Sequence, residues 1–250
     1  MKIYRKTVAN EIVKKSVELV APFANKLGER AFIFCESKST LSFERALAEG
    51  FGGSFSVEVT SFSRYVAKHS ARIDYVGKTQ ATLIIAKIMG EKKAELTRLK
   101  SNSFSTAGSI FELISQLKSA KVTPEKLDDI IEGESSALTF KLRDIRLIYG
   151  LYENHLKESG LVDDSGVMDE LPRLIRKDAA LSGAKVVVAG ISNFTAQTLD
   201  AVQALDEVAE LDCVVLSYDG DSALNESLDK LKKLCEDAVV VEDEKIYPSL

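Results

Sequence analysis

Histidine, cysteine and tryptophan are scarce in this chain of 250 residues, which contains two histidines, three cysteines and no tryptophan. Cys35, Cys213 and Cys235 are far apart, and two of them stand inside apolar runs, so we expect small core residues rather than disulfides or ligands. With only His69 and His155 available, no spacing predicts a zinc site or a serine-histidine-aspartate triad. We therefore predict no metal site and no catalytic residue.

Long apolar runs are also missing. No stretch reaches the roughly 18 uninterrupted apolar residues of a membrane span, and the N-terminal MKIYRK leads into charged sequence rather than a signal peptide. We expect a cytoplasmic protein with no membrane partner. The net charge of −5 argues against a nucleic-acid footprint over the whole surface, but leaves local binding, or binding shared with a partner, open.

Both ends of the chain alternate between apolar runs and helical patterns. Strands are predicted at residues 2–4, 31–35, 55–60, 185–189, 212–217 and 238–241, with helices between them. Strands and helices in regular alternation are typical of a parallel α/β sheet. We predict one α/β domain formed by residues 1–65 and 183–250 and incomplete at its C-terminus.

The intervening region, residues 66–182, shows no convincing strand and carries apolar positions at helical spacing. A Thr-Pro-Glu sequence at residues 123–125 indicates a helix start, and Ser159 with Gly160 indicates the end of a long helix at residues 138–158. We predict an all-helical insertion in the sheet domain.

The triplet Gly77, Lys78 and Thr79 resembles the end of a phosphate-binding loop, G-x-x-x-x-G-K-[ST]. The first glycine is missing, because Arg72 stands in its place. Such a loop must also follow a buried strand, whereas this segment follows a helix-like one and carries Asp74. We interpret Thr79 as the cap of the next helix.

The two positions where nucleotide chemistry belongs in this layout lack the necessary residues. Between the first strand and first helix, Arg5, Lys6 and Thr7 include no glycine to wrap a triphosphate. Carboxylates for Mg²⁺ should end a buried strand, but the strand of the second half ends in Ala189 and Gly190. We predict a degenerate nucleotide-binding fold with no nucleotide, metal or other cofactor in this segment.

Several short motifs follow one another along nearly the whole chain. They are AFIFCES at 31–37, SFERAL at 42–47, VEVTSFSR at 57–64, KLRDIRLIY at 141–149, LVDD at 161–164 and GISNFTAQ at 190–197. In order and spacing they resemble the start of the AddB/RexB subunits of bacterial ATP-dependent helicase-nuclease complexes. The last motif is similar to that family's G-F-x-x-F-[ST]-x-[QE] turn.

The resemblance implies a superfamily-1-helicase-like, RecA-like (P-loop-NTPase-like) domain with a helical subdomain inserted in it. It also implies a heterodimer with an AddA/RexA-type subunit that carries the motor, and a part in exonuclease resection of double-strand breaks for recombinational DNA repair. Some members keep an N-terminal phosphate loop, which this chain lacks, as the RexB branch does. Because members are much longer and their nuclease motif and iron–sulfur cysteines lie far C-terminal, we expect a fragment that begins at the natural Met1, ends inside the sheet domain and is not itself catalytic.

In helicase-like proteins the loops at the carboxyl ends of the sheet strands contact DNA. Here these loops carry Ser37, Lys38, Ser39, Thr40, Thr60, Ser61, Phe62 and Arg64. Hydroxyl groups and arginine contact phosphates, and Phe62 can stack on a base. The structural alternative makes Ser39 and Thr60 helix caps and puts Phe62 in the core.

The expected helix at residues 138–158 has a charged face that can contact DNA or a partner. Its basic residues are Lys141, Arg143, Arg146 and Lys157. A solvated helix face is the simpler account, because Asp144, Glu153 and Glu158 lie among these bases.

Two other functions stay open. A free-standing α/β enzyme for a small substrate would use carboxylates such as Asp163 with Asp164 or Asp219 with Asp221, although no base or nucleophile accompanies them. A scaffold would use the helical insertion for docking, without contacting nucleic acid.

Overall fold

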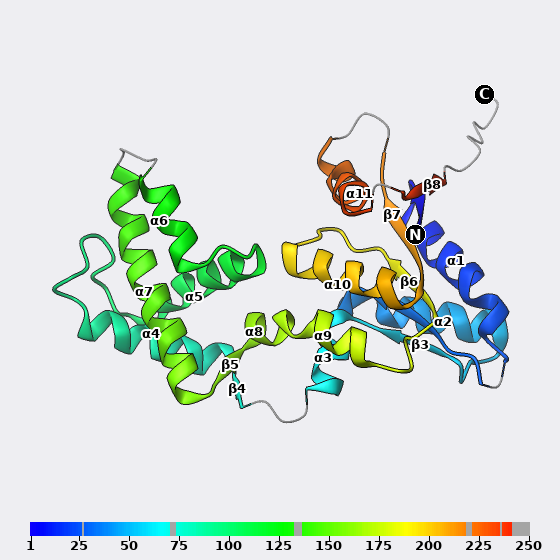
Figure 1. Ribbon diagram of the computed structural model, residues 1–250, viewed down its shortest axis with the longest axis horizontal. Coiled ribbons are helices and arrows are strands. Elements are labelled where there is room, and N and C mark those ends of the chain that lie inside the picture. Colours follow the sequence, from blue (N-terminus) through cyan, green and yellow to red (C-terminus); the bar gives the residue numbers. More distant parts are fainter. Residues whose placement is uncertain (27, 71–73, 133–136, 219–221, 236, 242–250) are drawn as a thin grey trace. The chain divides into compact units, whose positions relative to one another are not determined.

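The computed structural model describes residues 1–250 apart from residues 27, 71–73, 133–136, 219–221, 236 and 242–250. The chain folds into two compact units (Figure 1). The sheet unit consists of residues 1–69 and 170–250, and the helical unit of residues 70–169. The chain therefore leaves the sheet unit once and returns to it.

A six-stranded sheet forms the centre of the sheet unit. Its strands are β1 Lys2–Lys6, β2 Ala31–Cys35, β3 Val57–Thr60, β6 Lys185–Ala189, β7 Glu210–Leu216 and β8 Val239–Val241, in the spatial order β3-β2-β6-β7-β1-β8. The pairings among these strands are parallel. Strands β2 and β6 are buried along their whole length, as parallel strands covered on both faces are. The prediction of a parallel α/β fold is confirmed.

Helices cover both faces of this sheet (Figure 1). On one face lie α1 Ala9–Val20 and α2 Thr40–Phe51, with the short 3-10 helices η1 Ala21–Phe23 and η2 Ser37–Ser39 beside them. Their core includes Ile12, Ile33 and Val187. On the other face lie α3 Phe62–His69, α9 Leu171–Lys177, α10 Ala196–Val208 and α11 Ser222–Leu234. Here Phe34, which alternates with Ile33, stacks on Phe62 of α3 at a ring-centroid distance of 5.2 Å.

Helix α9 belongs to the sheet unit, although the sequence analysis assigns it to an insertion of residues 66–182. Its side chains Leu171 and Ile175 are fully buried, and the helix packs against α10 and α3. A helical apolar pattern predicts that a face is buried but not which neighbour covers it. For that reason the pattern of residues 171–177 could not show on which side of the boundary this helix lies.

The helical unit has a core of its own. Its helices are α4 Lys78–Glu91, α5 Phe104–Ser119, α6 Pro124–Glu132, α7 Ala137–Ser159 and α8 Asp164–Asp169. Ile85, Ile114 and Ile148 are fully buried in this core. The expectation of an all-helical insertion is wrong in one respect, because β4 Tyr75–Val76 and β5 Val162–Asp163 form a small parallel pair. Two-residue strands are too short to produce an alternating pattern in the sequence.

Candidate nucleic-acid interface

The carboxyl ends of three neighbouring strands meet at one edge of the sheet. Phe34 of β2 lies opposite Thr60 of β3 and Val188 of β6, so the residues that follow these strands come together. Ligands of open α/β sheets bind outside this edge. The two loops that carry the predicted DNA contacts both begin here.

Three serines from these loops form a hydrogen-bonded cluster. The Ser37 hydroxyl donates to Oγ of Ser61 at 2.9 Å and lies 3.3 Å from Oγ of Ser63, and the Ser61 and Ser63 hydroxyls are 3.1 Å apart. Ser37 and Ser63 are exposed. The cluster, in which Ser63 was not predicted, joins the loop after β2 to the start of α3 and presents two hydroxyl groups to solvent.

The eight predicted residues divide by exposure. Ser37, Lys38 and Arg64 are exposed and Ser39 is partly so, whereas Thr40, Thr60, Ser61 and Phe62 are buried. The Thr40 hydroxyl donates to the backbone carbonyl of Ser37 at 3.2 Å. The loops thus offer Ser37, Lys38 and Arg64 to a ligand, while the buried members hold the loops in place.

The helix caps differ from those expected. Ser39 occupies the N-cap position of α2 without a side-chain capping bond, and Thr60 is the buried end of β3. Oγ of Ser61 accepts the backbone N–H of Arg64 at 3.2 Å and so caps α3. Phe62 is 6% exposed and packs on Phe34, as the structural alternative expects.

Glu36 connects the β2 loop to the loop after β6. Its carboxylate accepts the backbone N–H of Ser192 at 2.9 Å and the Ser192 hydroxyl at 2.5 Å, and Lys38 Nζ lies 2.7 Å away. Burial disfavours ionisation of Glu36, but the hydrogen bonds from Lys38 and Ser192 outweigh it and lower the pKa of the carboxyl group. Glu36 therefore stays charged at neutral pH and holds Lys38 at this edge.

Another polar group at the same edge was not predicted from the sequence. Arg5 Nε donates to the Ser217 hydroxyl at 3.3 Å, and that hydroxyl donates to the Asn225 side-chain oxygen at 2.5 Å. Lys230 Nζ donates to the Phe194 carbonyl at 2.8 Å. These residues come from β1, β7 and α11 and are brought together only by the strand order.

The connection from β1 to α1 consists of two residues, Thr7 and Val8. Val8 is the N-cap residue, and its extended backbone is followed directly by the helix. A triphosphate requires a longer glycine-containing loop whose N–H groups converge on the phosphates. The connection has no such loop.

The Gly77, Lys78 and Thr79 segment starts α4 without the predicted threonine cap. Gly77 is the N-cap residue, and Thr79 is an exposed residue inside the first turn, so the interpretation of Thr79 as the cap is wrong. The preceding segment is the short strand β4, not a helix. Lys78 Nζ pairs with Glu112 at 2.7 Å, and Arg72 lies outside the described residues.

Strand β6 ends without a carboxylate. Ala189 is fully buried, and the N–H of Gly190 donates to the Val214 carbonyl at 3.0 Å. Neither residue offers a side-chain ligand for a cation. Among the described residues no group of three or more metal-ligating side chains comes together.

The carboxylates considered for an enzyme of small substrates have structural partners. Asp163, which is 1% exposed, accepts bonds from Lys118 at 2.9 Å and from the Tyr152 hydroxyl at 3.1 Å. Asp164 accepts a short hydrogen bond from the Tyr75 hydroxyl. Asp219 and Asp221 lie outside the described residues.

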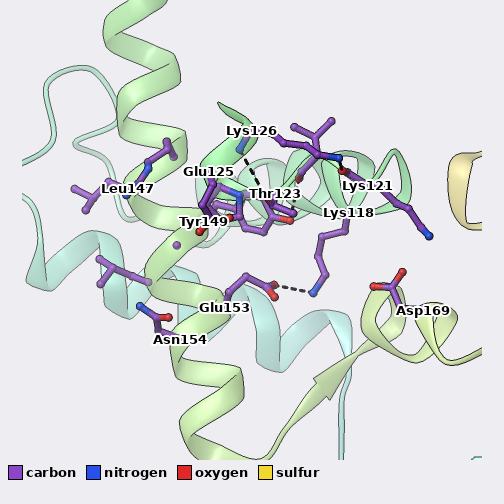
Figure 2. A pocket seen from close by; sticks show the side chains of 15 residues that line it. Lys118, Lys121, Thr123, Glu125, Lys126, Leu147, Tyr149, Glu153, Asn154 and Asp169 are labelled. Carbon is purple, nitrogen blue, oxygen red and sulfur yellow. Dashed lines mark hydrogen bonds and ion pairs between the residues drawn. The ribbon is translucent and has the colours of Figure 1, made fainter. Parts of the chain in front are cut away.

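Lys118 is the buried cation of this network. Burial opposes its charged form, but the charge of Asp163 and the hydrogen bond to Glu153 outweigh this effect and raise the pKa of its ammonium group. A cavity of about 720 Å³ lies beside it in the helical unit, between the α5–α6 turn and α7. Figure 2 shows Lys118 and Glu153 turned toward each other at this cavity. The described residues that line it include no serine, cysteine or histidine, so it offers no nucleophile of these types.

The cysteines do not form disulfides. All three are free, and Cys35 and Cys213 are buried. Burial raises the pKa of Cys35 to about 12, which keeps it a neutral thiol, and also raises the pKa of Cys213. In the part of the chain that the structure describes, no helix combines the length and the apolar character needed to cross a lipid bilayer.

The charged face of α7 is less neutral than the sequence suggests. Asp144 is 3% exposed and accepts the backbone N–H groups of residues 97–99, and Glu153 pairs with the buried Lys118. The bases Lys141 and Arg143 remain exposed beside them. The expectation that Asp144 lies among the surface bases is therefore wrong.

A wholly parallel sheet covered on both faces, with a compact helical unit inserted between α3 and α9, defines a RecA-like α/β protein. The family described as "ADDB, N-terminal" matches residues 18–234. The chain belongs to this family, and the AddB/RexB resemblance is confirmed.

Its relatives, each named as the second subunit of an ATP-dependent helicase/deoxyribonuclease, are much longer than this chain. The protein of Desulforudis audaxviator is 27% identical over 196 residues, which are 74% of this chain and 17% of the relative. The protein of Moorella thermoacetica is 30% identical over 208 residues, 77% of this chain and 18% of the relative. The protein of Pediococcus pentosaceus is 27% identical over 207 residues, 76% of this chain and 16% of the relative.

Proposed function

We propose that this chain is the helicase-like N-terminal part of a nuclease subunit that processes DNA ends for recombinational repair. In this proposal it binds DNA and a motor-carrying partner subunit in the cytoplasm, without a cofactor and without hydrolysing ATP itself. The observation that carries the proposal is the family match over residues 18–234, because the relatives are named as helicase/deoxyribonuclease subunits.

The DNA contact is proposed at the sheet edge. Ser37, Lys38 and Arg64 are exposed there, on loops held by the serine cluster and by the Glu36 to Ser192 bonds. Cations and hydroxyls on pre-ordered loops suit phosphate oxygens, which receive most protein–DNA hydrogen bonds. Phe62 is excluded from base stacking in this arrangement because its ring packs in the core.

The absence of ATP hydrolysis is proposed from the two places where the chemistry would occur. The β1–α1 connection is Thr7 and Val8 alone, and β6 ends in Ala189 and Gly190. A sheet that keeps the RecA-like order without these groups can still position DNA and partner surfaces.

The DNA contact is tested by measuring the affinity of the chain for single-stranded and duplex DNA at low and moderate salt. The double variant Lys38→Ala/Arg64→Ala is expected to weaken binding and to lower the slope of log affinity against log salt by about 1.4 to 1.8. Lys26→Ala/Arg30→Ala is the matched control, since both residues lie before β2, at the opposite edge of the sheet. Unchanged binding by the first variant would remove the sheet edge from the proposal, and no salt-dependent binding even with the partner subunit would favour a scaffold.

A further inference from the structure

We propose that the helical unit carries a second nucleic-acid contact, a basic loop surface formed by Arg98 and Lys100 of the α4–α5 loop and by Lys141 and Arg143 of α7. The choice of nucleic acid over other polyanions rests on the proposed function. The surface itself is separate from the sheet edge, because all four residues lie in the helical unit. Its ligand is the phosphate backbone of a single strand.

The loop is attached to α7 by a buried carboxylate. Asp144 accepts the backbone N–H of Thr97 at 2.9 Å, of Arg98 at 2.6 Å and of Leu99 at 2.8 Å. Hydrogen bonds to a charged group contribute more than neutral ones, so three of them fix the backbone at this point. The side chain of Arg98 is thereby held next to the turn of α7 that carries Lys141 and Arg143.

Two further contacts anchor the loop on the helical unit. Leu96, just before the bonded residues, is 1% exposed and belongs to the core of the unit. Farther along, Asn102 lies so close to Gly90 of α4 that a Cβ atom on Gly90 would meet its side-chain nitrogen at 3.0 Å. A loop held at both ends loses little conformational entropy when a ligand binds to it.

The positive charge of the basic loop surface is not neutralised by the described residues. Arg98, Lys100, Lys141 and Arg143 are exposed, and no described carboxylate pairs with them. The nearby Glu95 pairs with Lys92 at 2.8 Å, and the buried Asp144 uses its oxygens on backbone N–H groups. In a chain whose net charge is −5, four free cations at one place indicate a polyanionic ligand.

The groups beside these cations are those that bind single strands. Ser101 and Asn102 are exposed and polar, and Phe104, the first residue of α5, is 55% exposed. The N-terminus of α5 adds partial positive charge at the same point. Single-stranded nucleic acid is bound by basic surfaces with an aromatic side chain on which a base stacks.

The test compares two charge-reversal variants of the full chain in binding a fluorescent 20-nucleotide oligo-dT and a hairpin duplex. Arg98→Glu/Lys100→Glu is expected to lower the affinity for oligo-dT at least roughly tenfold at low salt and to reduce the salt slope by about 1.4, or about 0.7 for each lost phosphate contact. Phe104→Ala is expected to weaken oligo-dT binding while leaving the salt slope unchanged, because stacking releases no counterions. Lys232→Glu/Lys233→Glu, on the exposed part of α11, changes the net charge equally and should have little effect.

The outcomes separate this surface from the sheet edge. Loss of binding in Lys38→Ala/Arg64→Ala with wild-type affinity in Arg98→Glu/Lys100→Glu would overturn the basic loop surface and keep the proposed function. Equal losses in the loop and α11 variants would reduce the effect to net charge and also overturn it. Preferential loss of duplex binding would assign a duplex instead of a single strand, and competition by polyglutamate as strong as by oligo-dT would assign an acidic protein.

Discussion

Gly190 adopts a backbone conformation that other residues rarely accept. It follows β6 with a φ of +63°, in the left-handed region. A Cβ atom there would lie 3.6 Å from Cγ2 of Ile12, which is an ordinary contact, so the backbone rather than lack of space requires glycine. This turn also leads the chain to Ser192, which bonds to Glu36.

Replacing Gly190 by alanine is expected to lower the free energy of unfolding by about 1 to 2 kcal/mol, the cost of a left-handed non-glycine residue. Gly50→Ala is the matched control, because Gly50 lies in α2 with open space around it. That change should raise stability by up to about 1 kcal/mol. Urea unfolding of both variants measures the difference, and equal effects of the two changes would contradict the conformational argument.

At the scale of elements, Asp178 ties the end of α9 to α3. Its carboxylate accepts the Tyr65 hydroxyl at 2.6 Å and the backbone N–H of Ala180 at 2.9 Å, and His69 Nε2 lies 3.5 Å away. Burial raises the pKa of Asp178, but these hydrogen bonds outweigh it, so the pKa lies below its ordinary value. The folded protein therefore favours the charged carboxylate.

A lowered pKa in the folded state makes stability depend on pH. The contribution of ionised Asp178 is fully present above the unfolded pKa of about 3.9 and is lost as pH falls through the lower folded pKa. Asp178→Asn should therefore be less stable than wild type by about 1 to 2 kcal/mol at pH 7, with the difference shrinking below about pH 4. Tyr65→Phe should remove part of the same pH dependence. Unfolding measured from pH 3 to pH 7 checks this, and a constant difference would disprove it.

At the scale of the whole molecule, the RecA-like sheet is expected to lack ATP chemistry. Purified chain should hydrolyse no ATP, and Mg·ATP should not raise its melting temperature, because ligands stabilise only proteins that bind them. Ala189→Asp alone should restore nothing, since the β1–α1 connection still lacks a phosphate loop. A turnover that disappeared in Lys78→Ala would instead assign nucleotide binding to the start of α4.

Local patterns predicted most of the fold because the physics behind them is local. Alternating or fully apolar runs predicted the sheet strands, and the 138–158 pattern predicted α7 to within one residue at each end. Two-residue strands and the partner of α9 could not be predicted this way, since both depend on a neighbour distant in sequence. The candidate DNA loops do lie at the strand ends, but the sequence did not show which of their residues are exposed.

What the sequence determined by itself is composition and succession: parallel strands alternating with helices, and no glycine or carboxylate where nucleotide chemistry needs them. Only the tertiary structure decided that Phe62 and Asp144 are buried, that Ser63 and Ser192 join the sheet edge, and which cations lack a carboxylate partner. The reason is that exposure and charge pairing are properties of surfaces assembled from distant segments. A residue's own neighbours in the chain do not contain that information.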